Sequence, residues 1–133
     1  MKKAVSLLTI VCFVATLAMF SSCSKSQEDL IVGTWKCTSV TCEPENPWTN
    51  LMLGFTFVFN ADMTMSATAF GETDNGAYTI GNNKLTATYD GETIVFDIKK
   101  LDKKELTLVY TDVDEDDEGN PVTYTMTLGF TRQ

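Results

Sequence analysis

The C-terminal part of the chain alternates between apolar and polar side chains. From residue 122 to residue 131, threonine or glycine separates five apolar residues, which are Val122, Tyr124, Met126, Leu128 and Phe130. A period of two residues indicates a β-strand with one buried face, because successive side chains of a strand point to opposite faces. The same pattern occurs at residues 53–59, 63–70 and 93–101. The chain must therefore build its core mainly from half-buried strands.

Short turn signals separate the alternating runs. Asn60-Ala61-Asp62, Gly81-Asn82-Asn83, Asp90-Gly91-Glu92 and Asp102-Lys103-Lys104 are rich in residues that favour turns. We expect strands at residues 32–40, 53–59, 63–70, 77–80, 84–89, 93–101, 105–111 and 122–131. We expect a further turn at 72–76, an acidic loop at 112–120 and a single helical turn at 27–31.

The predicted fold class is all-β, an eight-stranded antiparallel up-and-down meander. A meander leaves two exposed edge strands unless it closes, and closure into a barrel removes both edges. The interior of an eight-stranded barrel is either filled by side chains or holds one small ligand. A filled core is the more common outcome in small barrels, and we favour it here.

The N-terminus reads as a targeting segment. Lys2 and Lys3 precede an apolar run at 4–20, which ends in Ser21-Ser22-Cys23. This run resembles a bacterial lipoprotein signal, and the resemblance implies that Cys23 is the lipidated first residue of the mature protein. The alternatives are an ordinary secretory signal with a chance cysteine, or a transmembrane helix, although the apolar run is shorter than the roughly 20 residues that span a bilayer.

This interpretation divides the chain into a signal peptide at 1–22, a lipidated cysteine and tether at 23–30, and a barrel domain at 31–133. It predicts an outer membrane lipoprotein of the cell envelope that faces the periplasm or the cell surface. The polar residues 24–29 are a plain linker, or they resemble signals that send lipoproteins to the surface of some Gram-negative cells.

The composition argues against several functions. The 18 acidic residues outnumber the 10 basic ones and give a net charge of −8, which opposes nucleic-acid binding. The chain has no histidine, so Cys/His zinc sites and His-dependent triads are excluded. No nucleophile elbow, P-loop or Rossmann fingerprint is present. We therefore predict no enzyme activity, no cofactor and no metal.

The acidic segment at 112–120 resembles the start of a calcium loop. The twelfth position counted from Asp114 is Thr125 rather than a bidentate glutamate, so the match is incomplete. A solvated hairpin tip explains the segment better.

Cys37 and Cys42 are the thiols that remain after Cys12 leaves with the signal and Cys23 takes the lipid. Outside the cytoplasm the two could form a disulfide, which would require a turn between them. The alternative is a pair of buried, inert thiols.

Gly33-Thr34-Trp35 begins the first strand, and Arg132 follows Phe130-Thr131 at the end of the last. With the eight predicted strands, this pattern resembles the lipocalin-like small lipoproteins of the lipocalin and calycin group. The resemblance implies structural roles for Gly33, Trp35 and Arg132, with the guanidinium of Arg132 packed over Trp35 as a cation–π contact.

The resemblance also implies a barrel pocket for a hydrophobic molecule, partly covered by the first long loop at 43–50. The candidate ligand-binding residues are Trp48, Phe55, Phe57, Tyr78, Tyr110 and Tyr124. We therefore expect a lipid-anchored extracytoplasmic protein that binds a small apolar ligand or an envelope protein. The alternative is a structural or accessory subunit of an envelope complex, or an enzyme inhibitor, with a filled barrel and no small ligand.

Overall fold

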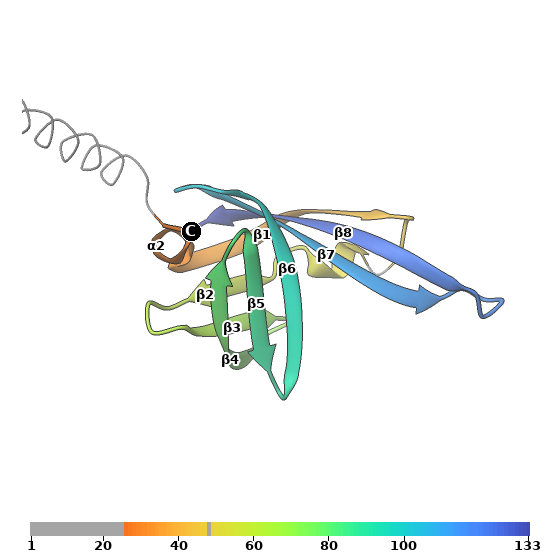
Figure 1. The fold of residues 1–133 in the computed structure, drawn as a ribbon, viewed down its shortest axis with the longest axis horizontal. Coiled ribbons are helices and arrows are strands. Elements are labelled where there is room, and N and C mark those ends of the chain that lie inside the picture. Colours follow the sequence, from red (N-terminus) through yellow and green to blue (C-terminus); the bar gives the residue numbers. More distant parts are fainter. Residues whose placement is uncertain (1–25, 48) are drawn as a thin grey trace, which may run out of the picture.

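The computed structural model describes residues 26–47 and 49–133. Eight antiparallel strands form a closed barrel in which each strand pairs with its neighbours in sequence and β1 pairs with β8 (Figure 1). The elements in order are α2 (Gln27–Ile31), β1 (Gly33–Glu43), the 3₁₀ helix η1 (Thr49–Met52), β2 (Thr56–Phe59), β3 (Thr64–Ala69), β4 (Glu72–Gly81), β5 (Lys84–Tyr89), β6 (Glu92–Leu101), β7 (Glu105–Glu115) and β8 (Pro121–Arg132). The all-β meander and its closure are confirmed. Cys23, the predicted signal peptide and Trp48 lie outside the described residues.

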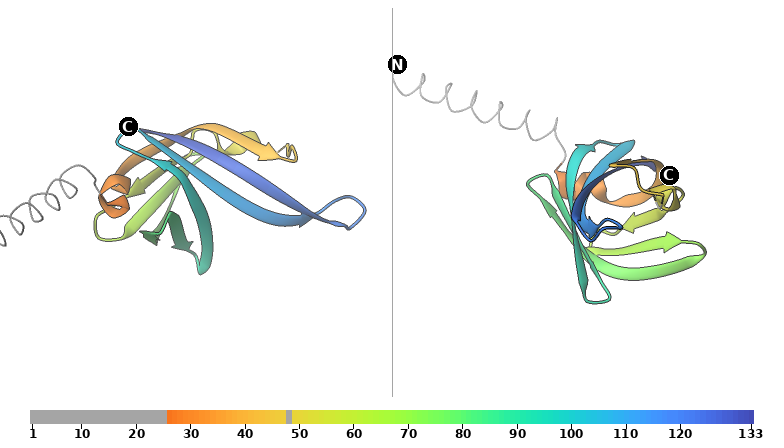
Figure 2. Two further views of the ribbon diagram at one scale, coloured as in Figure 1. Left: turned by 45° about the horizontal axis from the view of Figure 1, so that its top comes forward. Right: turned by 90° about the vertical axis from the view of Figure 1, so that its right-hand side faces the viewer.

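The two ends of the barrel differ. Helix α2, the C-terminus and the β6–β7 turn lie at one end, which we call the closed end, and the β7–β8 hairpin extends beyond the other strands at the opposite, open end (Figure 1). Seen from the side of that hairpin, the strands surround a common axis (Figure 2). Residues 26–133 include all eight strands and their closing β1–β8 ladder. We therefore expect this segment to fold on its own.

The predicted turn at 72–76 is wrong, because these residues form the first half of β4. The chain reverses two residues earlier, at Phe70 and Gly71, which both have positive φ values of 52° and 79°. Positive φ at both central residues gives the compact hairpin turn whose twist matches the flanking strands. Residue Glu72 then pairs with Ala69, and the ladder continues to Ala77 opposite Thr64. A polar stretch was mistaken for a loop.

Two other predicted boundaries also move. The strand expected at 105–111 continues to Glu115, so the acidic loop shrinks to a hairpin tip in which the Asp116 carboxylate accepts hydrogen bonds from the backbone N–H groups of Glu118 and Asn120. The strand expected at 53–59 begins only at Thr56, because η1 ends at Met52 and is followed by a turn at Leu53 and Gly54.

The possible disulfide between Cys37 and Cys42 does not form, since both residues are buried free thiols on the continuous strand β1. No turn separates them, so their Cα atoms lie roughly 16 Å apart at the rise of a strand, well beyond the about 4.4–6.8 Å that a disulfide bridges. A bulge between Cys37 and Ser39 shifts the alternation by one residue. This shift explains how two cysteines with an odd spacing both face the interior.

The closed end is filled and covered. Helix α2 places Ile31 in the core with 0% exposure, and Gln27 exchanges two hydrogen bonds with Asn83 in the β4–β5 turn, at 2.8 and 3.1 Å. Residues 27–30, expected in the tether, are therefore packed against the barrel. The Ser26 hydroxyl caps the helix by accepting from the Asp29 N–H. Any linker that does not contact the barrel must therefore end before α2, at Ser26.

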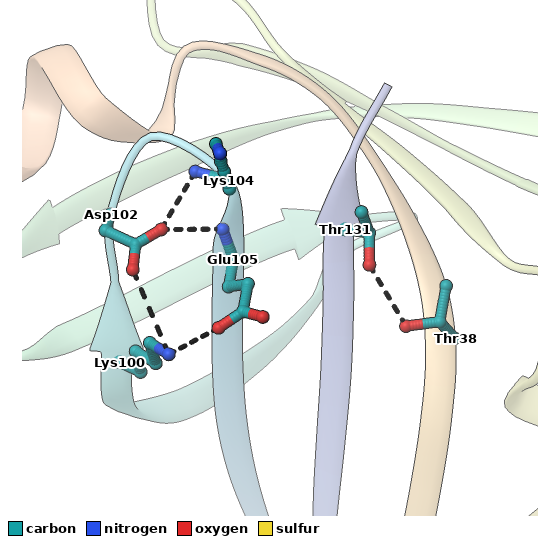
Figure 3. A network of polar contacts seen from close by, with 6 residues as sticks. All are labelled: Thr38, Lys100, Asp102, Lys104, Glu105 and Thr131. Carbon is teal, nitrogen blue, oxygen red and sulfur yellow. Dashed lines mark hydrogen bonds and ion pairs between the residues drawn. The ribbon is translucent and has the colours of Figure 1, made fainter.

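Polar contacts fix the β6–β7 turn at the same end (Figure 3). The Asp102 carboxylate accepts from the backbone N–H groups of Lys104 and Glu105, both at 2.8 Å, and these bonds lower the pKa of Asp102. Lys100 pairs with Glu105, which raises the pKa of Lys100. The turn holds β7 in register with β6, so the closed end is fixed by local contacts as well as by its core. Among the described residues, no helix is long and apolar enough to cross a bilayer.

Candidate ligand cavity

The open half of the barrel encloses a cavity of about 380 Å³. It is lined mostly by apolar side chains from seven of the eight strands, β2 to β8, from η1 and from the residues next to β2 and β3. The lining residues are Met52, Phe55, Phe57, Ala67, Ala69, Phe70, Glu72, Asp74, Tyr89, Ile94, Phe96, Tyr110, Met126 and Leu128. The favoured expectation of a filled barrel therefore holds only for the closed half.

Small residues make the space. Ala67 and Ala69 are the cavity-facing residues of β3, where larger side chains would occupy the interior. Gly76 on β4 has no side chain, and a Cβ placed there would lie 2.3 Å from the Thr88 carbonyl oxygen. The glycine thus lets β4 and β5 approach closely at the point where the hollow half begins.

Large rings form the floor of the cavity. Phe57 is only 6% exposed and stacks on Phe130 with ring centroids 5.1 Å apart. Phe96 and Leu128 are also buried and line the same floor. Because these side chains seal the cavity from the filled closed half, a ligand can reach it only from the open end.

Three of the predicted ligand-binding residues line the cavity, namely Phe55, Phe57 and Tyr110. Tyr78 does not: it is 2% exposed in the closed half, where its ring contacts Phe59 at 5.0 Å and its hydroxyl donates to the Asn60 carbonyl at 2.7 Å. The Tyr78 side chain faces the barrel interior as expected, but its position along β4 is too near the closed end to reach the cavity.

Tyr124 is also absent from the cavity lining. It pairs with Asp112 on the part of the β7–β8 hairpin that extends past the last β6–β7 pair, Asp97 with Val109. Figure 1 shows this hairpin extending beyond the other strands, so the apolar alternation of β8 continues past the cavity lining. Trp48 lies outside the described residues, and nothing is assigned to it.

Sequence reasoning missed other lining residues. Met126, Leu128 and Ile94 carried a usable signal, since they belong to the alternating faces of β8 and β6. Glu72 and Asp74 carried no usable sequence signal for a cavity position, because their segment was expected to be a turn.

Polar groups gather at the mouth of the cavity. Burial raises the pKa of the Tyr89 hydroxyl, and the carboxylates of Asp74 and Glu92 raise it further. Burial and the charge of Asp112 act in the same direction on the pKa of Tyr110. Both phenols are therefore neutral at physiological pH, and they can donate or accept hydrogen bonds.

A group of polar and ring contacts centred on Arg132, which we call the Arg132 staple, stabilises the closed end. The guanidinium of Arg132 lies 4.3 Å from the centroid of the Trp35 ring and donates to the carbonyl oxygens of Leu30, Val32 and Lys103. The Trp35 Nε1–H donates to the Ile31 carbonyl at 2.8 Å. Gly33 has φ +142° and faces the guanidinium so closely that a Cβ there would lie 2.2 Å from Arg132 Nη1. The first strand, the last strand and helix α2 are thus joined at one point.

This arrangement agrees with the comparison to protein families, in which the model described as "Lipocalin-like domain" matches residues 31–108. The chain belongs to the lipocalin-like domain family. The match covers more than half of the chain and includes the Gly33-Thr34-Trp35 segment and the first six strands. No curated protein matches the sequence.

Several solved structures are similar to this lipocalin-like domain at low identity. A DUF4847 family protein from Bacteroides vulgatus is 13% identical, with a TM-score of 0.47 over 77% of this chain and 95% of that one. The bovine odorant-binding protein with its natural ligand is 20% identical, with a TM-score of 0.47 over 83% and 75%. Its complex with undecanal is 21% identical, with a TM-score of 0.45 over the same shares.

The lipocalin-like domain shows no group of three or more metal-ligating side chains within residues 26–47 and 49–133. At the acidic hairpin tip, the Asp116 carboxylate is already used by the turn itself. The absence of a cofactor and of enzyme activity stays a prediction.

Proposed function

We propose that this protein binds one small apolar molecule in the cavity at the open end, outside the cytoplasm, while a lipid on Cys23 holds it to the outer membrane. The observation that supports binding is the cavity itself, which is about 380 Å³ in volume, mainly apolar and sealed at its floor. An apolar pocket with a few polar groups at one side is the usual form of a small-molecule site.

The size of the cavity limits the ligand. At about 30 Å³ for each water-sized group, the cavity holds roughly a dozen non-hydrogen atoms. Each methylene transferred from water into it contributes about 0.8 kcal/mol. A linear chain of about ten carbons therefore fits, whereas a sterol or a two-chain lipid is too large.

The proposed anchor sets the orientation of the barrel. Ser26 caps α2 at the closed end, so a lipid on Cys23 would be joined to that end by Ser24 and Lys25. The open end would then face away from the membrane, toward the periplasm or the cell exterior. A ligand would reach the cavity from the aqueous side.

Ligand binding is tested on residues 24–133 by titration with decanol, a neutral amphiphile of the expected size. Ala67→Phe fills the cavity from β3 and should abolish binding. Ser66→Phe adds a comparable ring to the opposite face of the same strand and should leave binding unchanged. Equal decanol affinity in wild type and both variants, or no binding to the wild type, would refute the cavity as the site.

Native mass spectrometry of the same segment, exported by its own host type, identifies the natural occupant. A discrete extra mass that is lost on denaturation would support the proposal. A clean apo mass together with no decanol binding would favour the alternative of an accessory subunit or inhibitor, and crosslinking for a protein partner would follow.

The anchor is tested separately in cells. Cys23→Ala should leave the precursor uncleaved and unlabelled by fatty acid, with Cys12→Ala as the control that is processed normally. Normal processing of the Cys23 variant would contradict the anchor without affecting the cavity.

A further inference from the structure

Charge is distributed unevenly along the barrel axis. Every lysine and arginine of the described residues lies in the closed half, and these are Lys36, Lys84, Lys99, Lys100, Lys103, Lys104 and Arg132. Acidic residues there largely balance them, whereas the open half has only acidic charges, at Glu43, Glu45, Glu72, Asp74, Asp90, Glu92, Asp112, Asp114, Glu115, Asp116, Asp117 and Glu118. Charges of one sign around a cleft raise the local concentration of ligands of the opposite sign.

Two of the open-end carboxylates belong to the inner face of the wall. Strand β4 alternates, and its buried residues Tyr78 and Ile80 share their parity with Asp74 and Glu72. The register places Asp74 opposite Ala67 and Glu72 opposite Ala69, which line the cavity on the neighbouring strand. Both carboxylates also line the cavity.

Solvent exposure allows polar residues at these two positions but does not require acidic ones. Inward-pointing charges protect the edges of open sheets, but β4 is paired on both sides, with β3 and with β5. Neither Glu72 nor Asp74 has a basic partner among the described residues, and no lysine or arginine lines the cavity. The two negative charges at the mouth are therefore uncompensated by the protein.

The neighbouring phenols add hydrogen-bonding capacity. Tyr89 and Tyr110 line the same cavity, and within the part of the chain that the structure describes neither hydroxyl has a hydrogen-bond partner. The mouth thus combines two carboxylates with two phenolic oxygens that can all accept hydrogen bonds. Below them the cavity becomes wholly apolar at Phe57, Phe96 and Leu128.

We propose that the occupant is a cationic amphiphile, a molecule with a protonated amine head and a single short apolar tail. This rests on the proposed function, and it adds the chemistry of the head group. The ammonium lies between Glu72 and Asp74 and donates to their oxygens, while the tail extends to the floor formed by Phe57, Phe96 and Leu128. A fatty acid of the same length would bring its carboxylate against two like charges.

The test uses three ligands with the same ten-carbon chain, which are decylamine, decanol and decanoate, titrated into residues 24–133 at low and at high salt. An alkylamine is protonated at neutral pH, as a lysine side chain is. Because both carboxylates are exposed to solvent, we expect decylamine to bind about fivefold tighter than decanol, with a preference that shrinks as salt is added. Decanoate should bind more weakly than decanol.

The double variant Glu72→Gln with Asp74→Asn keeps the shape of the wall and removes both charges. It should bind decylamine and decanol equally well, with its decanol affinity unchanged. The matched control is Asp117→Asn with Glu118→Gln, which removes the same net charge from the β7–β8 hairpin tip outside the cavity lining. The control should keep the preference for the amine.

The outcomes separate the two proposals. If decanol binds but decylamine binds no tighter, or if decanoate binds tightest, the cationic head is refuted and the cavity stands. If the control loses the preference as much as the cavity variant does, the general field of the open end is responsible and the local site is refuted. If none of the three ligands binds, both proposals fail. Circular dichroism spectra of the variants confirm that they fold.

Discussion

The staple at the closed end gives the sharpest test of what stabilises this barrel. Arg132→Met keeps the aliphatic stem but removes the contact with the Trp35 ring and the three hydrogen bonds to the carbonyl oxygens of Leu30, Val32 and Lys103. The Leu30 and Val32 carbonyls accept in partly buried surroundings. The substitution therefore removes contacts that join α2, β1 and the β6–β7 turn to the end of β8.

The magnitude follows from these contacts. A hydrogen bond from a charged donor contributes about 1.5–3 kcal/mol when buried, and partial exposure of the guanidinium reduces this to about 1 kcal/mol for each bond. The cation–π contact adds about 0.5–1 kcal/mol. We expect Arg132→Met to lower the free energy of unfolding by about 3.5–4 kcal/mol, a large part of the stability of a small domain.

The assay is urea unfolding of residues 24–133, followed by circular dichroism. Arg132→Lys retains the charge but cannot direct donors to three separate carbonyls, so it should lose most of the same free energy. Lys36→Met is the matched control, because Lys36 neighbours Thr131 on the adjacent strand and its exposed side chain has no partner among the described residues. If Arg132→Met and the control differ by less than about 0.5 kcal/mol, which is the range of ordinary surface substitutions, the reasoning is refuted.

Three further predictions test the fold. Gly76→Ala should destabilise the domain by about 1–3 kcal/mol in the urea assay, because its Cβ would meet the neighbouring backbone, whereas Gly81→Ala, with nothing within 4 Å, should be nearly neutral; equal effects would contradict the close approach. Hydrogen bonds from the hydroxyl and the backbone N–H of Thr64 lower the pKa of Asp62 in the folded protein below its ordinary value of 3.8, so its stabilising effect is present above that value and is lost as the pH falls through the lower folded pKa. The melting temperatures of wild type and Asp62→Asn should therefore converge as the pH falls below 3.8, and a constant difference would count against this origin. In residues 24–133, Cys37 and Cys42 should react with a thiol reagent as two free thiols after denaturation and stay unreactive in the folded domain. A count of zero would show that β1 is not a continuous strand.

Much of the fold could be predicted because the core strands obey local rules. The alternation in β2, β6 and β8 and the turn residues between strands determined the meander, since each strand has one face on the core and the register follows from short hairpins. The bulge in β1 could not be predicted. Its effect is that Val40 and Cys42, rather than Ser39 and Thr41, face inward, and no residue at the bulge distinguishes it in the sequence.

The depth of a residue in the barrel was equally hard to predict. Alternation assigns a side chain to the inner face but gives no position along the axis, so Tyr78 and Tyr124 seemed equivalent to Tyr110. Their actual positions depend on strand stagger, which places Tyr78 in the filled half and Tyr124 beyond the wall. The division into a filled half and a hollow half is a property of the closed barrel rather than of any one strand.

The most informative failure concerns residues 72–76. They were expected to be a turn because the segment is polar and ends in a glycine, whereas the structure places Glu72 and Asp74 on the inner face of β4. A sequence that follows local rules in its core and breaks them in one place often does so at a functional site. Here the break coincides with the mouth of the cavity, and the closed end carries the packed core and the Arg132 staple. Since the stabilising contacts are concentrated at the other end, folding does not require carboxylates at Glu72 and Asp74. Their double substitution therefore tests whether these two residues serve ligand binding.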